Sequence, residues 1–261
     1  SVLFVRRQRG LEQPLLEFSI FRNPAFSAGV LAAAFSMFAI GGSQLVTTQR
    51  YQLVEGFTPL EAGLLVAAVA IGSLPTALLG GAFLHRIGLL PLIAGGLAVA
   101  SLGVVVVIIG VQADVFGVLV AGLLVTGAGL GGAMSVASTA IMGNVPARRA
   151  GMASSVEEVS YEFGSLTAVA LLGSLLTFVY TTPVRLPAGA PEGADESPSD
   201  ALATAGGDRA IIEAASSAFG TGFLVTMIIL AVVLAVGAAV TGRLLRHHGP
   251  GTQSKAFSGN H

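Results

Sequence analysis

Six long apolar stretches run through this chain, and they constrain its fold more than any other feature. About 20 apolar residues are needed to cross the ~30 Å hydrocarbon core of a bilayer as an α-helix. Because lipid offers no hydrogen-bond partner to an open backbone, such stretches can cross a membrane only as helices. Short polar interruptions separate all but the last two. The predicted spans are 25–48, 60–84, 88–110, 115–142, 150–180 and 219–243.

The composition fits a membrane protein and argues against several other classes. Only 10% of the 261 residues are charged and 53% are hydrophobic, whereas soluble domains carry about 25% charged residues. There is no cysteine, which excludes disulfides and thiol nucleophiles. No nucleophile–base pair or metal-ligand spacing stands out, so we expect no enzymatic activity, no metal or cofactor and no nucleic-acid partner. The histidines fall in predicted loops or the tail, at His85, His247, His248 and His261.

The spans are closely spaced, so we expect one all-α transmembrane bundle over residues 25–246. Residues 1–24 begin with an apolar run that ends in arginines, and we interpret them as the end of a preceding helix plus a cytoplasmic linker. The chain would then be the C-terminal piece of a longer protein. Residues 181–218 are predicted to form a solvated extracytoplasmic loop, whose second half has the spacing of a short surface helix. Residues 247–261 are expected to be a disordered cytoplasmic tail.

The basic residues are distributed unevenly about these spans, and this distribution predicts the orientation. Six spans put both ends of the chain on one side, and ten of the 13 Lys and Arg residues fall on that side. Cytoplasmic loops of membrane proteins carry the excess of basic residues. We therefore expect a multi-pass protein of the bacterial inner membrane with both ends in the cytoplasm. The three exceptions are Arg50, Arg185 and Arg209.

The motif GAGLGG inside the fourth span fits the G-x-G-x-x-G pattern of dinucleotide-binding sites. Such a site requires a preceding strand within a soluble βαβ unit, which a membrane span does not supply. Small residues spaced four apart instead let membrane helices pack closely. The glycines assigned to helix packing are Gly127, Gly129, Gly131 and Gly132.

A short polar turn, NVPARRAGM, follows the fourth span. We expect Pro146 to stop that helix, and Arg148 and Arg149 to mark the cytoplasmic turn before the fifth span. A positive-inside anchor explains both arginines. A gating ion pair with a partner outside this chain is the alternative.

Three acids in the fifth span are the strongest functional signal. Glu158 lies about 13 Å into a helix that starts near Arg149, at 1.5 Å per residue. Glu158 and Glu162 are spaced i,i+4 and share one face, whereas Glu157 is rotated from Glu158 by about 100°. No basic residue lies at comparable depth in the six predicted spans, and an unpaired carboxylate in a membrane is costly unless it faces water or takes up a proton. We predict that Glu158 and Glu162 form a cavity-facing pair that exchanges protons and attracts a cation, with Glu157 the weaker candidate.

A purely structural interpretation of these acids stays open, in which they hydrogen-bond to neighbouring helices or lie nearer the membrane surface. Two aromatic residues beside them, Tyr161 and Phe163, are candidates to contact an organic cation through their rings. Aromatic residues near helix interfaces nevertheless more often serve packing alone.

The fifth span carries a family resemblance. The segment VPARRAGMASSVEEVSYEFGSLTAVALLGSLLTFVY, with six spans and the arginine turn, resembles the C-terminal half of a major facilitator superfamily drug:proton antiporter. More narrowly, it is similar to the fourteen-helix branch that exports quaternary ammonium compounds and methyl viologen. LEFSIFRNPAF resembles the amphipathic segment before that family's ninth helix. GAFLHRIGLLP is similar to its short cytoplasmic loop between helices ten and eleven, with His85 where the family often has an Asp.

This resemblance implies a fold of two six-helix bundles around a central cavity, with two further helices between them. It implies export of lipophilic, cationic compounds by alternating access, with proton coupling and cation recognition by Glu157, Glu158 and Glu162. The expected partners are the lipid bilayer, small lipophilic or cationic substrates, and the N-terminal half of the same polypeptide, with the proton gradient as energy source. Two alternatives stay open, namely a major facilitator exporter of an endogenous metabolite and a non-transporting membrane scaffold subunit.

Overall fold

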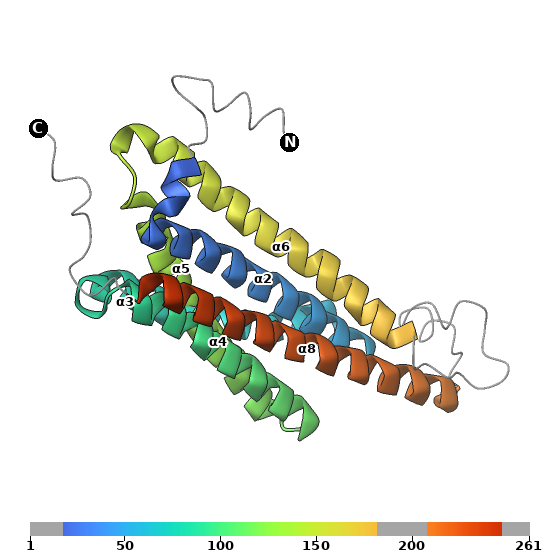
Figure 1. Cartoon of the computed structure of the whole chain (residues 1–261). Helices are drawn as coiled ribbons and strands as arrows, with labels where there is room; N and C mark the ends of the chain where they lie inside the picture. The colour runs from blue at the N-terminus through green and yellow to red at the C-terminus, as the bar shows by residue number, and fades with distance from the viewer. Residues whose placement is uncertain (1–17, 182–207, 247–261) are drawn as a thin grey trace, which may run out of the picture.

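The computed structural model describes residues 18–181 and 208–246, which form one bundle of six long α-helices (Figure 1). Two short 3-10 helices, η1 and η2, precede the first and the fifth of them. The elements in chain order are η1 (Phe18–Arg22), α2 (Pro24–Leu53), α3 (Pro59–Ile87), α4 (Leu89–Gln112), α5 (Phe116–Met142), η2 (Ala147–Arg149), α6 (Ala150–Thr181) and α8 (Arg209–Leu245).

The predicted fold class, an all-α membrane protein of six spanning helices, is confirmed. Each of the six α-helices in the described part of the chain is long and apolar enough to cross a membrane. Five of the six predicted spans start within one residue of an observed helix. Residues 1–17 and 247–261, for which a linker and a tail are predicted, lie outside the described residues.

The sixth predicted span starts too late. Helix α8 begins at Arg209, so the prediction of a loop through residue 218 is wrong for residues 209–218. The Asp208 carboxylate accepts a hydrogen bond from the Ala210 backbone N–H at 2.9 Å and caps the helix start. The helical spacing noted in this stretch therefore belongs to the first turns of α8 itself, and not to a separate surface helix. The remainder of that predicted loop, residues 182–207, lies outside the described residues.

The other helix starts also follow from local sequence. The Asn23 side chain accepts hydrogen bonds from two backbone N–H groups of α2, and Pro24 occupies the first helical position, where its missing N–H costs nothing. Thr58 and Glu61 form a capping box at the start of α3, in which each side chain bonds to the other residue's backbone N–H. Gly88 separates α3 from α4 with a φ of 86°, a conformation that glycine adopts without steric cost.

Helices α2 and α5 form the centre of the bundle. Helix α5 packs mainly against α4 and α3, whereas α2 packs mainly against α6 and α8 and also contacts α5. Helices α4 and α8 contact each other, and α3 and α6 lie at opposite edges. Accordingly, α2 and α5 are the most buried of the six helices and α3 and α6 are among the least buried. This order separates the surroundings of α3 from those of α6.

The glycines of α5 divide between two neighbouring helices. Gly127 and Gly131 face α3, where an added Cβ would overlap backbone carbonyls, and Gly129 faces the backbone of α4 in the same way. Such contact between backbones requires residues without side chains. Gly132 is buried and its Cα lies 3.6 Å from the position of a Cβ added to Gly80 of α3, but a Cβ on Gly132 itself would meet no atom within 4 Å. Gly132 also lines an open groove of about 460 Å³ between α3, α4 and α5.

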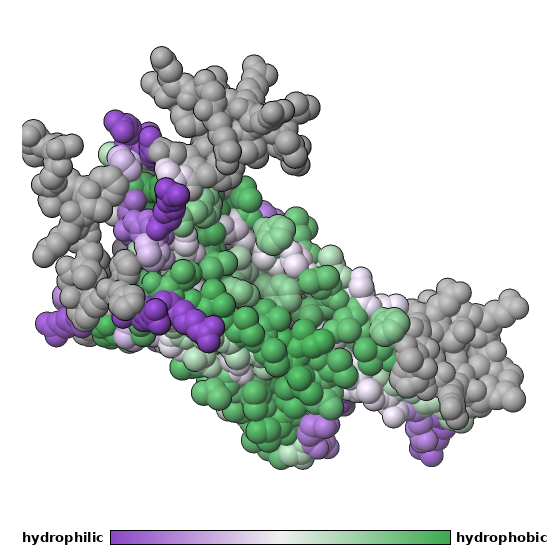
Figure 2. Space-filling view, in the orientation of Figure 1, coloured by the Kyte–Doolittle hydropathy of each residue, from purple (hydrophilic) through white to green (hydrophobic). Residues whose placement is uncertain are grey.

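The outer surface of the bundle is apolar along its length and hydrophilic at its ends, as the space-filling view shows (Figure 2). Four leucines of α3 are each more than 60% exposed, which a soluble protein of this size rarely tolerates as a contiguous patch. The exposed leucines are Leu60, Leu64, Leu74 and Leu78. This distribution is the one expected of a protein whose sides face lipid.

Candidate functional site

The three predicted acids all lie on α6, and they differ from one another in burial. Glu157 is buried, with 8% of its surface exposed, whereas Glu158 and Glu162 are both exposed. The helical spacing correctly placed Glu158 and Glu162 on one face. The packing of α6 turns the Glu157 face toward the bundle, and the functional roles of Glu158 and Glu162 as the stronger pair and of Glu157 as the weaker candidate stay predictions.

Glu157 is held by a single hydrogen bond. The Tyr161 hydroxyl donates to Oε1 of Glu157 at 2.8 Å, across one turn of α6. No ion pair to Glu157 is found in residues 18–181 and 208–246. A buried carboxylate without a cationic partner is stable only if it is well hydrogen-bonded or protonated.

The depth of Glu157 follows from its place on α6. It lies about 10 Å along the helix from Ala150, at 1.5 Å per residue. The preceding residue, Val156, packs in an apolar cluster with Phe26 of α2 and Ile141 of α5. The residue next to Glu157 in the chain therefore belongs to the apolar core at this end of the bundle.

The two aromatic candidates play different parts. The Tyr161 hydroxyl is engaged by Glu157, so this residue positions the acid. Phe163 is 67% exposed and stands next to Glu162 on the outer face of α6. Because most of its surface is exposed, its ring is available to a molecule or helix that approaches from outside the bundle.

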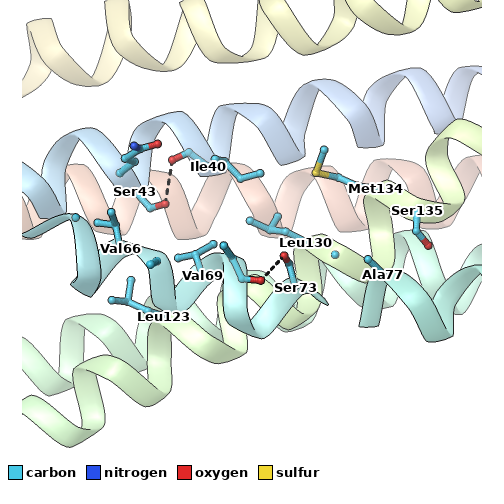
Figure 3. A pocket seen from close by; sticks show the side chains of 15 residues that line it. Ile40, Ser43, Val66, Val69, Ser73, Ala77, Leu123, Leu130, Met134 and Ser135 are labelled. Carbon is cyan, nitrogen blue, oxygen red and sulfur yellow. Dashed lines mark hydrogen bonds between the residues drawn. The ribbon is translucent and has the colours of Figure 1, made fainter. Parts of the chain in front are cut away.

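A separate cavity of about 660 Å³ lies between α2, α3 and α5 (Figure 3). Its size falls within the usual range of small-molecule sites. The lining residues are mostly small or aliphatic, and include Ile40, Val66, Val69, Leu123, Leu130 and Met134. None of the lining residues is an acid, a base or an aromatic residue.

Four polar side chains interrupt this lining. The Ser43 hydroxyl donates to the Ile40 carbonyl at 3.2 Å, and the Ser73 hydroxyl donates to the Ala70 carbonyl at 2.8 Å. Figure 3 shows both bonds, each closing on its own helix. Gln44 makes no hydrogen bond to any described residue, and the buried Ser135 hydroxyl has no partner there either. Sequence reasoning missed this cavity, because its lining comes from three helices.

The three acids and the cavity lie at different helix interfaces of the bundle. The cavity lies where α3 and α5 meet α2, whereas α6 packs against α2 and α8. None of the three glutamates lines the cavity. Helix α2 borders the cavity and makes most of the contact with α6, whereas α5 borders the cavity and touches α6 less.

The turn between α5 and η2 differs in detail from the prediction. Helix α5 ends at Met142, so Pro146 does not stop it and instead stands before η2. The Asn144 amide donates to the Ala140 carbonyl at 2.7 Å and satisfies one of the last carbonyls of the helix. The same side chain accepts a hydrogen bond from Asn23 at 3.1 Å, which ties the end of α5 to the start of α2.

The two arginines predicted for this turn lie in η2. The Arg148 side chain is exposed, and Arg149 is half-buried. Neither lies beside the buried Glu157 as an ion-pair partner. Their expected role as an anchor at the membrane surface stays a prediction.

An ion pair at the C-terminal end of α2 was also not predicted from the sequence. Helix α2 continues to Leu53, past the predicted end at 48, and therefore includes Arg50. The Arg50 guanidinium donates to Glu55 at 3.2 Å and lies 5.2 Å from the ring centroid of Phe223 on α8. Nothing in the sequence identifies Phe223 as its partner. No cluster of three or more side chains able to hold a metal ion occurs in residues 18–181 and 208–246.

Six apolar helices in one bundle, with a cavity between three of them and an acid buried along a fourth, define a multi-pass membrane protein. The family model for the Major Facilitator Superfamily matches residues 25–189. The chain belongs to the major facilitator superfamily, as its resemblance predicts.

Proteins with related sequences include several named for drug efflux. The multidrug efflux pump LfrA of Mycolicibacterium smegmatis is 31% identical over 94% of this chain and 51% of its own length. The methyl viologen resistance protein SmvA of Salmonella typhimurium is 30% identical over 72% of this chain and 38% of its own length. The multidrug resistance protein Stp of Mycobacterium tuberculosis is 36% identical over 67% of this chain and 32% of its own length. The chain therefore spans about half the length of these relatives or less.

Solved structures show the same fold at low sequence identity. A bacterial homolog of the human lysosomal transporter Spinster, in an inward-facing and occupied conformation, matches 91% of this chain and 52% of its own with a TM-score of 0.63 and 18% identity. The transporter FucP in its outward conformation matches 92% of this chain and 53% of its own with a TM-score of 0.59 and 15% identity. Both likenesses concern the fold alone.

Proposed function

We propose that this chain is part of a proton-coupled multidrug efflux antiporter that exports lipophilic, cationic compounds by alternating access. The observation that carries the proposal is Glu157, an acid buried in a membrane-spanning helix without a cationic partner among the described residues. Sequence similarity to proteins named as multidrug efflux pumps supports the kind of substrate. Acids at membrane depth in transporters mark proton relays and ion pathways.

The three glutamates have different roles in this proposal. Glu157 carries the proton in this proposal, because it is buried in a membrane-spanning helix without a cationic partner among the described residues. Its bond from Tyr161 keeps the carboxylate in place. Glu158 and Glu162 stand on the exposed face of α6, where they attract the cationic end of a substrate. Phe163 beside them offers a ring face for cation–π contact.

The cavity between α2, α3 and α5 receives the lipophilic part of the substrate. Its volume and its aliphatic lining suit an apolar group. Because α2 borders both the cavity and α6, protonation of Glu157 is coupled to the cavity through movement of α2. Binding and proton exchange are thus linked without direct contact between substrate and Glu157.

The proposal includes a second bundle and an orientation. Transporter sites of this kind lie between repeated bundles near the middle of the membrane, so the partner of this bundle is the N-terminal half of the same polypeptide. The distribution of basic residues supports cytoplasmic placement of both ends, in a bacterial inner membrane. The starts of α2 and α6 and the end of α8 lie together at one end of the bundle (Figure 1).

One observation favours a second candidate, export of an uncharged endogenous metabolite. The cavity lining holds no acid, so a neutral compound would fit it equally well. Inhibition by competing organic cations distinguishes the two candidates, because only a transporter of cations is expected to show it. A non-transporting scaffold would show no substrate binding that depends on pH.

The test is exchange by the full-length protein in inverted membrane vesicles. Ethidium serves as the fluorescent cation, and an imposed pH gradient drives its movement. Glu157→Gln is expected to lower gradient-driven exchange at least tenfold, with smaller losses for Glu158→Gln and Glu162→Gln. Glu213→Gln is the matched control, since Glu213 is an exposed acid of α8. Exchange at the original rate in Glu157→Gln contradicts the mechanism.

A further inference from the structure

The polar side chains of the α2/α3/α5 cavity differ in whether their hydrogen bonds are already formed. Ser43 and Ser73 each donate to a carbonyl of their own helix, as hydroxyls in helices commonly do. Gln44 lines the same cavity without a hydrogen bond to any described residue. Its side chain offers two N–H donors and a carbonyl acceptor. Gln44 is exposed, and it is therefore the most accessible polar group of the lining whose hydrogen bonds are not already formed.

We propose that Gln44 determines the specificity of this cavity, by donating a hydrogen bond to an uncharged acceptor on an otherwise apolar ligand. This inference rests on the proposed function, since it takes the cavity to be a ligand site of the exporter. The ligand class is an amphipathic compound whose apolar body carries a carbonyl, amide or ether oxygen.

The absence of charge on the lining excludes a different ligand class. Among the residues that the structure describes, no carboxylate lines the cavity to balance a positive charge, and no aromatic ring lines it to contact a cation. Seating a cationic group in such surroundings would leave it unpaired, and this is strongly unfavourable away from water. The portion of a substrate that enters the cavity is therefore uncharged, and any cationic end stays outside it.

The cost of an unsatisfied amide gives Gln44 its selectivity. Gln44 is exposed in the lining, so water bonds to its amide while the cavity is empty, and a ligand that displaces this water loses affinity unless an oxygen of its own replaces the bond. A site built to hydrogen-bond a ligand group discriminates strongly against analogues that lack the group. A compound of the same shape without an oxygen leaves the Gln44 amide unpaired, and it should bind more weakly.

Ser135 is a second polar group of the cavity. Its hydroxyl is buried and has no partner among the described residues, and it lies beside Gly80, where an added Cβ would come within 2.8 Å of it. Figure 3 places Ser135 at the Ala77 and Met134 end of the cavity and Ser43, the neighbour of Gln44, at the other. The burial of Ser135 makes it the less accessible of the two, so Gln44 is expected to dominate.

The experiment compares two rigid probes that differ by one carbonyl oxygen, fluorenone and fluorene. Their binding to the full-length protein in lipid nanodiscs is measured by titration calorimetry, with empty nanodiscs subtracted. The unaltered protein is expected to bind fluorenone roughly threefold to tenfold more tightly than fluorene, the size of one neutral hydrogen bond. Gln44→Leu should remove this preference and should bind fluorene at least as tightly as the unaltered protein does, which also shows that the variant is folded. Gln44→Met provides a second apolar replacement of similar length.

Ser43→Ala and Ser73→Ala are the matched controls, because both hydroxyls already donate to their own helices. Both variants should keep the preference for fluorenone. A large side chain at Gly63 tests where the probes bind, since this residue lines the cavity and a Cβ there meets no atom within 4 Å. Gly63→Phe should weaken the binding of both probes. Gly81→Phe should not weaken it, because Gly81 is an equally open position of α3 that does not line this cavity.

Three results would overturn the inference. These are an unchanged fluorenone preference in Gln44→Leu, a loss of the preference in Ser135→Ala alone, and no preference in the unaltered protein. The proposed proton coupling is tested separately by the vesicle assay on Glu157→Gln. Fluorenone binding can depend on Gln44 in a protein whose ethidium exchange does not respond to the pH gradient. That combination would contradict the proposed function and would still support the ligand site.

Discussion

Replacing Gly127 by alanine tests how α5 is held against α3. A Cβ at Gly127 would overlap the backbone carbonyl of Val69, and this carbonyl cannot move unless the two helices separate. Overpacking of a tight interface costs about 1–3 kcal/mol. Gly132 is five residues further along the same helix, and a Cβ there meets no atom within 4 Å. Alanine is favoured over glycine in a helix interior by up to ~1 kcal/mol, so Gly132→Ala should be neutral or stabilising.

Both variants gain the same helix propensity, so they are expected to differ by the overpacking cost alone, about 1–3 kcal/mol. For a chain of this size that corresponds to roughly 2–12 °C in Tm. The assay is thermal stability of the full-length protein in detergent, followed by size-exclusion chromatography after heating. Gly131→Ala, which also meets an α3 carbonyl, should behave like Gly127→Ala. Equal stability of Gly127→Ala and Gly132→Ala would refute the assignment of the two faces of α5.

Two further predictions concern hydrogen bonds between named partners. Asn23→Ala removes the cap of α2 and its bond to Asn144, and should lower thermal stability by about 1 kcal/mol or somewhat more. Adding Asn144→Ala should then cost less than it does alone, and full additivity would show that the two side chains act independently. Tyr161→Phe should slow proton-driven ethidium exchange several-fold because Glu157 loses its only hydrogen bond among the described residues. In the Glu157→Gln background the same change should have no further effect, and an equal loss in both backgrounds would mean that Tyr161 acts elsewhere.

The number and positions of the helices could be predicted from the sequence because the length of an apolar stretch is a direct physical requirement of the bilayer. The end of α2 and the start of α8 could not. Charge alone predicts that the span ends before Arg50, yet the Arg50 side chain reaches Glu55 and the ring of Phe223. Asp208 caps a helix whose first turns are too polar to be counted as part of a membrane span.

The candidate site was predicted only in part. Helical phase alone separated Glu157 from Glu158 and Glu162, but phase does not say which face packs against the bundle. That depends on the contact of α6 with α2, including the close approach of Gly164 to Ala34. The cavity beside Gln44 has no signature in the sequence, because three helices from separate parts of the chain line it. The glycine motif likewise predicted close packing, yet only the structure distinguishes Gly132 from its neighbours.

The central claim is that Glu157 exchanges a proton as substrate binds. Proton release can be measured directly when ethidium is added to the purified full-length protein in weakly buffered detergent solution. We predict that the unaltered protein releases protons on binding, and that Glu157→Gln binds ethidium with no release. Equal proton release by Glu157→Gln and by the unaltered protein would contradict the claim.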